Sequence, residues 1–285
     1  MTDWILLRGL MREQRHWGDF PRLFQQALPQ ARIATPDLPG NGRLHREASP
    51  ARVAHMVEWC RRDAAARGQR GPVHLLALSL GAMVAVEWAA RYPDEIAALV
   101  LINTSMRPFS PFYRRLRWQN YGAIAALALR GGAARLERQE QLILRLTSRD
   151  HHRPQHAKAG AEGEGEALLR RWQDYQREYP VSRANALRQL LSAARYRAPA
   201  LRPLPPMLVL ASAADRLVDA RCSLGLAGRW QAECHLHPTA GHDLPLDEGA
   251  WVAAKVRDWL TAGNMQAQPQ PQQGPAPPDG ASVKY

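Results

Sequence analysis

The chain has 285 residues, 46% of them hydrophobic and 22% charged, and its 38 basic and 26 acidic residues give a formal net charge of +12. This composition is typical of a globular protein, and no apolar run approaches the ~18–20 residues of a membrane-spanning helix. The chain start lacks the pattern of a signal peptide and the three cysteines form no Cys-x-x-Cys pair, so we expect a cytoplasmic protein without a disulfide framework.

Short apolar runs alternate with helical patterns through the first third of the chain. The runs typical of buried strands are residues 4–7, 32–35, 73–78 and 98–102. The helical patterns between them are residues 19–28, 50–67 and 80–91. The alternation resumes later, with strand patterns at 207–211 and 232–236 and helical patterns at 219–229 and 247–261. Such alternation predicts an α/β fold, with a mostly parallel sheet of about six strands and helices on both faces.

The middle of the chain differs from both flanks. Residues 107–202 contain no convincing strand pattern, and the candidate helices within them are 116–129, 134–146, 166–179 and 183–196. The same segment holds 18 arginines and Lys158 against 8 acidic residues, which is nearly all of the net charge. We therefore expect a helical cap at 107–202, inserted into a core formed by 1–106 and 203–262. Residues 263–285 are rich in Pro and Gln, which predicts a disordered tail.

The segment Leu76-Ala-Leu-Ser79-Leu-Gly81 carries the strongest chemical signal. Ser79 lies between a predicted strand and a predicted helix, which is the position of a nucleophile elbow. A serine on such a sharp turn needs very small neighbours two residues away, and Ala77 and Gly81 meet this need. Ala77 stands where the motif usually has glycine, a sterically tolerable departure. We predict that Ser79 is a nucleophile.

A nucleophilic serine needs a general base, and the base needs an orienting carboxylate. In this topology both should follow later strands, in the order Ser, Asp, His. Asp215 follows the strand at 207–211, and His242 follows the last strand, with Gly241 allowing a sharp turn before it. We therefore predict a triad of Ser79, Asp215 and His242. The weaker alternatives are Asp219, which suits a helix start, and His235 and His237, which alternate along a strand.

Acyl transfer also requires two N–H donors for the oxyanion of the tetrahedral intermediate. The N–H of Leu80, directly after the nucleophile, is one candidate. The other is the N–H of Leu10, which follows Arg8-Gly9 after the first strand. The alternative for Arg8-Gly9 is an ordinary glycine turn at a strand end.

With these residues in place, the chain resembles the α/β-hydrolase superfamily, in its esterase-like branch with a helical cap. The loop Asp37-Leu-Pro-Gly-Asn-Gly42 is similar to the family's Asp-x-x-Gly-x-Gly loop near the oxyanion hole. Where the family usually has His-Gly, this chain has Arg8-Gly9, with Trp17 some residues further on. The guanidinium of Arg8 could bind an anionic substrate group or a structural carboxylate, so Arg8, Gly9 and Trp17 are candidate substrate-binding residues.

The resemblance implies hydrolysis of a carboxylic ester or thioester through a seryl acyl-enzyme, with no metal and no organic cofactor. Ser79 excludes the dehalogenase and epoxide hydrolase branches, which need a carboxylate at the elbow. C–C bond hydrolases and perhydrolases share the triad, and some proteins of this fold only bind ligands, so these alternatives stay open. The expected partner is a small ester or thioester, neutral or anionic. We expect no nucleic acid partner and no membrane span, and the chain is a monomer or an oligomer of undetermined size.

The arginines of the predicted cap have two interpretations. They could receive a carboxylate, a phosphate or the nucleotide arm of an acyl-CoA. Alternatively, they form a solvated helix surface with ion pairs to Asp174 and Glu178, and we favour this second interpretation. The arginines concerned are Arg114, Arg115, Arg117, Arg170 and Arg171.

Overall fold

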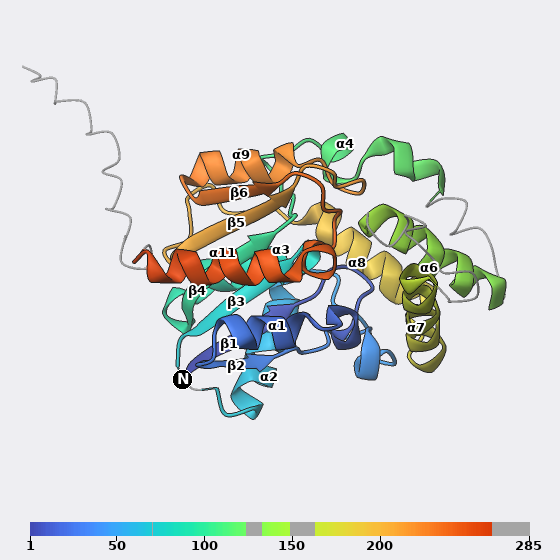
Figure 1. Cartoon of the computed structure of the whole chain (residues 1–285), viewed down its shortest axis with the longest axis horizontal. Coiled ribbons are helices and arrows are strands. Elements are labelled where there is room, and N and C mark those ends of the chain that lie inside the picture. Colours follow the sequence, from blue (N-terminus) through green and yellow to red (C-terminus); the bar gives the residue numbers. More distant parts are fainter. Residues whose placement is uncertain (70, 124–132, 149–162, 264–285) are drawn as a thin grey trace, which may run out of the picture.

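A six-stranded parallel sheet forms the centre of the computed structural model, which describes residues 1–69, 71–123, 133–148 and 163–263 (Figure 1). The strand order is β2-β1-β3-β4-β5-β6, and every neighbouring pair is parallel. The strands are β1 (Thr2–Leu7), β2 (Ala31–Ala34), β3 (Val73–Leu78), β4 (Ile96–Ile102), β5 (Met207–Ser212) and β6 (Glu233–His237). The α/β fold and the six strands expected from the sequence are confirmed.

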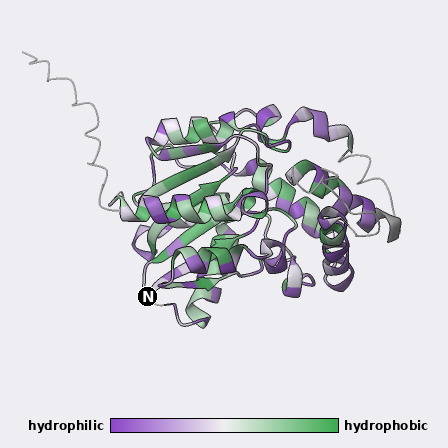
Figure 2. Ribbon diagram, viewed as in Figure 1, coloured by the Kyte–Doolittle hydropathy of each residue, from purple (hydrophilic) through white to green (hydrophobic). Residues whose placement is uncertain are grey.

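Helices cover both faces of the sheet. On one face lie α1 (Phe20–Ala27) and α11 (Gly249–Thr261), and on the other α2 (Val53–Ala66), α3 (Leu80–Arg91) and α9 (Arg221–Trp230). Along β1, Trp4 and Leu6 pack on the first face, and Ile5 and Leu7 pack on the second, because successive side chains of a strand alternate. Since both faces are covered at the centre of the sheet, β3, β4 and β5 are almost entirely apolar and buried, as Figure 2 shows for the centre of the molecule. The edge strand β6 is more polar and carries Glu233, His235 and His237.

The described residues of the segment 107–202, which are 107–123, 133–148 and 163–202, lie largely beyond the carboxyl ends of the strands (Figure 1). Their elements are α4 (Phe112–Arg115), the 3-10 turn η4 (Trp118–Asn120), α6 (Ala133–Thr147), α7 (Glu164–Glu178) and α8 (Arg183–Arg195). Within the described part of this segment, the strand-like pairing is limited to a single bridge between Arg107 and Arg197. Leu144 of α6 packs against Leu168 and Trp172 of α7 in a small apolar core of its own.

The helix expected at 116–129 is wrong for its first residues. Leu116 and Arg117 have extended backbone angles, with ψ values of 116° and 126°. The physical reason is a tertiary contact, because the N–H of Arg117 donates to the carbonyl of Leu217 at 2.9 Å instead of continuing a helix. Residues 124–129 of that expected helix, and the expected tail from residue 264 onward, lie outside the described residues.

Two buried amides of α8 bind the core loop at 41–49. Gln189 donates to the Oδ1 of Asn41 and the Oγ of Ser49, both at 2.9 Å, and accepts from the N–H of Met11 at 2.8 Å. Asn185 accepts from the N–H of Ser49 at 2.9 Å. These bonds attach α8 firmly to the loops at the carboxyl edge of the sheet.

The remaining short elements are η1 (Gln14–Trp17), η2 (Gly42–Leu44), η3 (Pro93–Glu95) and α10 (Leu244–Asp247). Among the helices that the structure describes, none combines the length and apolar character needed to cross a bilayer.

Candidate active site

Ser79 occupies the turn between β3 and α3, with φ 56° and ψ −113°. A positive φ is uncommon for a residue with a side chain and persists only where neighbouring contacts hold it. Here the N–H of Ser79 donates to the carbonyl of Ile102 at 3.0 Å, and its own carbonyl accepts from the N–H of Ala82 at 3.1 Å. Ser79 is therefore held at the carboxyl edge of the sheet in the conformation expected of a nucleophile elbow, and it is only half-buried.

Two glycines let the end of β1 approach this elbow. A Cβ atom at Gly81 would collide with the carbonyl oxygen of Leu7 and lie 2.8 Å from that of Arg8. A Cβ atom at Gly9 would lie 3.3 Å from the Cβ of Ser79. Larger residues at either position would push the first strand and the elbow apart, so the loop after β1 lies directly against Ser79.

Asp215 and His242 form a buried pair. The Oδ2 atom of Asp215 lies 2.6 Å from Nδ1 of His242, and the two side chains are 1% and 5% exposed. The other carboxylate oxygen accepts from the N–H groups of Leu217 and Val218, both at 2.8 Å. Because a carboxylate can only accept, Nδ1 of the neutral ring carries the proton and Nε2 keeps its lone pair. This arrangement prepares His242 to act as a base at Nε2.

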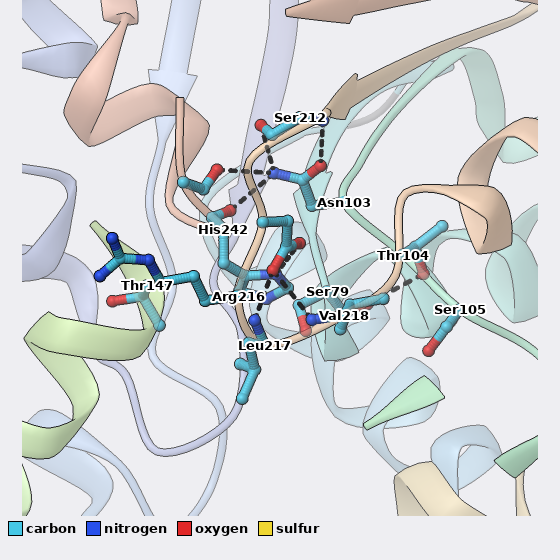
Figure 3. A network of polar contacts seen from close by, with 12 residues as sticks. Ser79, Asn103, Thr104, Ser105, Thr147, Ser212, Arg216, Leu217, Val218 and His242 are labelled. Atoms are coloured by element: carbon cyan, nitrogen blue, oxygen red, sulfur yellow. Dashed lines mark hydrogen bonds and ion pairs between the residues drawn. The ribbon is translucent and has the colours of Figure 1, made fainter. Parts of the chain in front are cut away.

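Adjacent residues after β4 link the histidine to the serine (Figure 3). The amide of Asn103 donates to the carbonyl of His242 at 2.8 Å, and the hydroxyl of Thr104 donates to the carbonyl of Ser79 at 3.3 Å. Asn103 also accepts from the N–H of Ser212 at 2.8 Å, at the end of β5. Ser79 and His242 are thus held by consecutive residues of the chain, which brings the three predicted triad residues to one place.

Two backbone donors beside the serine are unused. Within the part of the chain that the structure describes, the N–H groups of Leu10 and Leu80 have no hydrogen-bond acceptor. Leu80 is the first residue of α3, where N–H groups have no partner within the helix. Leu10 follows Gly9, which touches Ser79. Both positions are compatible with an oxyanion hole.

The sequence model of the α/β hydrolase fold family matches residues 5–249. The chain belongs to this family.

Its similarity to individual family members is more distant. The pimeloyl-[acyl-carrier protein] methyl ester esterase of Chromobacterium violaceum is 33% identical over 112 residues, which are 39% of this chain and 40% of that protein. The esterase of the same name from Aromatoleum aromaticum is 34% identical over 107 residues, which are 36% and 37% of the two chains. The match thus spans about two fifths of the length of these relatives.

A solved structure extends the similarity over the whole fold. A thermophilic esterase from Thermogutta terrifontis aligns with a TM-score of 0.69 and 20% identity, over 92% of this chain and 90% of the esterase. At this level of identity the comparison shows a shared fold.

In this α/β hydrolase, Arg8 has a carboxylate partner within the chain. Its Nη1 and Nη2 atoms donate to the two carboxylate oxygens of Asp243 at 3.0 and 2.6 Å, and both side chains are buried. The guanidinium also lies over the ring of Trp17, 4.7 Å from its centroid. Trp17 itself is 2% exposed and packs in the core. These contacts favour the structural interpretation of Arg8 and Trp17, whereas Gly9 does lie against Ser79.

The weaker triad candidates lie in other contacts. Asp219 accepts from Arg221 at 2.6 Å, and the hydrogen bonds from Arg221 lower the pKa of Asp219 to about 2. His235 contacts Glu233, and Nδ1 of His237 accepts from the N–H of Ala240 at 3.0 Å.

Hydrogen bonds to the side chain of Asp37 hold the loop at 37–42 in place. The carboxylate of Asp37 accepts from the N–H groups of Gln14 and Arg43, at 2.7 and 3.1 Å. Gly42 has φ 51° and presses against this carboxylate, so a side chain there would displace it. Burial raises the pKa of Asp37. The loop thereby supports the segment that follows Leu10.

The cap arginines have several different partners. Arg115 donates to the carbonyls of Ala193 and Ala194 at the end of α8. Arg170 lies 3.7 Å from Glu166, one helical turn away. Of the two acids expected to face Arg170 and Arg171, Asp174 pairs with Arg177 and Glu178 pairs with Arg15 of the core. The cap surface is therefore partly tied to the core rather than simply solvated.

Two residues that position His242 escaped the sequence analysis. Asn103 gave only the weak signal of a polar residue directly after an apolar strand. Thr147, at the end of α6, accepts from the N–H of Asp243 at 2.7 Å, and no pattern in the sequence pointed to it. Both act through contacts between residues that lie far apart in the chain.

Proposed function

We propose that this protein is a serine hydrolase that cleaves a carboxylic ester or thioester through an acyl-enzyme. The observation that carries the proposal is the buried pair of Asp215 and His242, held beside a serine in the elbow conformation. A carboxylate, an imidazole oriented by it and a serine hydroxyl on a sharp turn are the groups that acyl transfer requires.

In the proposed reaction His242 accepts the proton of Ser79 through Nε2 as the serine oxygen attacks the substrate carbonyl. The N–H groups of Leu10 and Leu80 stabilise the resulting oxyanion. Collapse of the intermediate breaks the bond to the leaving alcohol or thiol, which takes the proton from His242. A water molecule, deprotonated by the same histidine, then attacks the acyl-enzyme and releases the acid.

The substrate class within this reaction rests on a weaker argument. The two relatives are named for hydrolysis of a methyl ester, and they match about two fifths of their own length to this chain. We therefore infer that methyl esters of carboxylic acids are the first substrates to test, followed by aryl esters and acyl thioesters. C–C bond hydrolysis, perhydrolysis and binding without catalysis are the competing functions.

A fluorophosphonate probe tests the proposal directly, because it labels only activated serines. We expect labelling of the wild type, its loss in Ser79→Ala, and a fall of roughly 10³-fold or more in labelling rate in His242→Ala. Ser105→Ala and His235→Ala are matched controls that should label like the wild type, since the hydroxyl of Ser105 donates to the Arg115 carbonyl and His235 contacts Glu233. Folded wild-type protein that is not labelled would contradict the proposal and favour a binding function.

A further inference from the structure

A cleft of about 550 Å³ lies between the loop after β5 and the segment at 117–120. Asp215 and Arg216 line it from the loop after β5, and Arg117, Gln119 and Asn120 line it from the other side. Its size is within the range of small-molecule sites. Ser79 does not line it, so the cleft is adjacent to the proposed catalytic residues but is a separate feature.

Hydrogen bonds hold the two walls of the cleft together. The N–H of Arg117 donates to the carbonyl of Leu217 at 2.9 Å, and the side-chain amide of Asn120 donates to the carbonyl of Arg216 at 2.8 Å. The N–H of Asp219 completes the set by donating to the carbonyl of Arg114 at 3.0 Å. Hydrogen bonds therefore fix the shape of the cleft, and they hold the main chain of Arg117 and of Arg216 in place.

Neither arginine of the cleft forms an ion pair in direct contact with a carboxylate among the described residues, although the charge of Arg117 contributes to the lowered pKa of Asp219. The Nε of Arg117 is buried without a hydrogen-bond acceptor. Arg216 reaches only the carbonyl of Arg145, at 3.5 Å. Figure 3 shows the Arg216 side chain turned away from His242. This differs from the many arginines of the chain that pair with a nearby acid, such as Arg61 with Glu95.

The carboxylates closest to the cleft are already occupied. Asp215 is bound to His242 and to two backbone N–H groups, as described above. Asp219 is paired with Arg221 at 2.6 Å. These carboxylates are already hydrogen-bonded to other groups, so the two guanidinium groups keep N–H donors and positive charge suited to a carboxylate or phosphate.

We propose that this cleft binds the carboxylate or phosphate group of a small anion, which Arg117 and Arg216 hold from opposite walls. The anionic group has two sources with the same chemistry. The group belongs either to the far end of an ester substrate whose ester bond lies at Ser79, or to a separate small anion that binds next to Ser79, Asp215 and His242.

Binding is measured first, by titration calorimetry on the full chain at low salt with inorganic phosphate and with succinate as probes. We expect one saturable site for at least one of the probes, and a weakening of about tenfold or more in Arg117→Gln and in Arg216→Gln. Arg114→Gln is the matched control, because Arg114 lies in the same segment and does not line the cleft. Arg216 is exposed and Arg117 is half-buried, so Arg117→Gln and Arg216→Gln should both fold, and their unfolding temperatures check this.

Ester kinetics then separate the two sources. If the substrate supplies the anion, Arg117→Gln raises KM for an ester with a remote carboxylate and leaves KM for its neutral analogue unchanged. If a separate anion binds, both esters respond alike to Arg117→Gln, and phosphate binding persists in the presence of either ester. Both results support the cleft as an anion site.

Absence of saturable binding of both probes would overturn the proposal, and so would equal weakening by Arg114→Gln, which would indicate a general effect of charge. The binding arm does not depend on catalysis. A protein that binds phosphate through Arg117 and Arg216, yet is not labelled at Ser79, would retain the anion site and lose the proposed hydrolase function.

Discussion

The side-chain amide of Asn103 links β4, β5 and the loop that carries His242. Asn103 directly follows β4, accepts from the N–H of Ser212 at the end of β5, and donates to the carbonyl of His242. Its φ of 43° shows that the backbone accepts some strain to place this amide. Because the bond is to the backbone of His242, it sets the position of the ring without touching it.

Replacing Asn103 by Ala should impair the proposed ester hydrolysis more than it impairs binding. The loop of His242 would lose a direct bond to the end of β4, and a displacement of about 1 Å can cost on the order of 100-fold in rate. We expect kcat to fall about 10- to 100-fold, with KM within about twofold of the wild type. Steady-state kinetics and an unfolding curve measure both effects.

Asn185→Ala is the control for this prediction. Asn185 is also a buried asparagine with several backbone bonds, but it joins α8 to the loop at 45–49. It should lose a similar amount of stability, about 1–3 kcal/mol, and keep its kcat. An equal loss of kcat in both variants would show that Asn103 acts only through stability.

Residues that depend on local chain geometry were predictable, and residues that depend on distant partners were not. Ser79 directly follows a strand and has a small residue, Gly81, two positions further on. His242 follows the last strand with Gly241 before it, and both patterns are local. Arg8 was ambiguous because its partner, Asp243, is 235 positions away. The same holds for Asn103 and His242, which are 139 positions apart.

At the scale of elements, the strands were predictable because a covered parallel sheet demands continuous apolar runs. β3 is buried along its whole length and matches its predicted range at both ends. The segment at 116–129 failed for the opposite reason, since its helical composition was outweighed by one bond from Arg117 to the loop after β5. Propensity is a weak prior and yields to such tertiary contacts.

The contact between β1 and α3 makes a sharp prediction about Gly81. In Gly81→Ala the added Cβ would meet the carbonyls of Leu7 and Arg8, which are backbone atoms and cannot turn aside. We expect destabilisation of about 1–3 kcal/mol or more, together with loss of probe labelling at Ser79. Urea unfolding and the fluorophosphonate assay provide the two measurements.

Gly225→Ala is the matched substitution in α9, where nothing lies within 4 Å of an added Cβ. Alanine is favoured over glycine inside a helix by about 0.5–1 kcal/mol, so this variant should be slightly more stable and fully labelled. If Gly81→Ala behaved in the same way, the close packing of the elbow on β1 would be refuted.

At the scale of the whole molecule, a buried polar cluster joins the core to α6 and α7. Arg12 donates to Glu140 of α6 at 2.7 Å, and its guanidinium lies 4.5 Å from the ring centroid of Trp172 on α7. His16 packs edge-on against the same tryptophan and lies 3.1 Å from Arg12. Burial of charged groups is favourable only when they are paired, so removing one partner should be costly.

This cluster predicts a loss of stability in mild acid. Burial, helped by the charges of Arg12 and Arg8, lowers the pKa of His16 well below its ordinary value of 6.5. Below about pH 6.5 this histidine binds a proton in the unfolded chain but not in the folded chain. The free energy of unfolding therefore falls as the pH drops from 7 to 5. The slope from this residue is at most about 1.4 kcal/mol per pH unit.

His16→Gln removes this titration and should flatten the pH dependence, whatever the variant's stability at pH 7. Urea unfolding at pH 7, 6 and 5 gives the slope for both proteins. Parallel curves for wild type and variant would mean that His16 is protonated in the folded chain, in conflict with its burial.

The parallel sheet also decides how the protein can be handled. All six strands run the same way, so Ser79, Asp215 and His242 emerge at one end, and the amino end of β1 lies at the opposite end (Figure 1). Met1 is fully exposed there. A tag or a fused protein joined at Met1 would therefore leave the end that carries Ser79, Asp215 and His242 facing outward, which favours Met1 as the point of attachment to a surface.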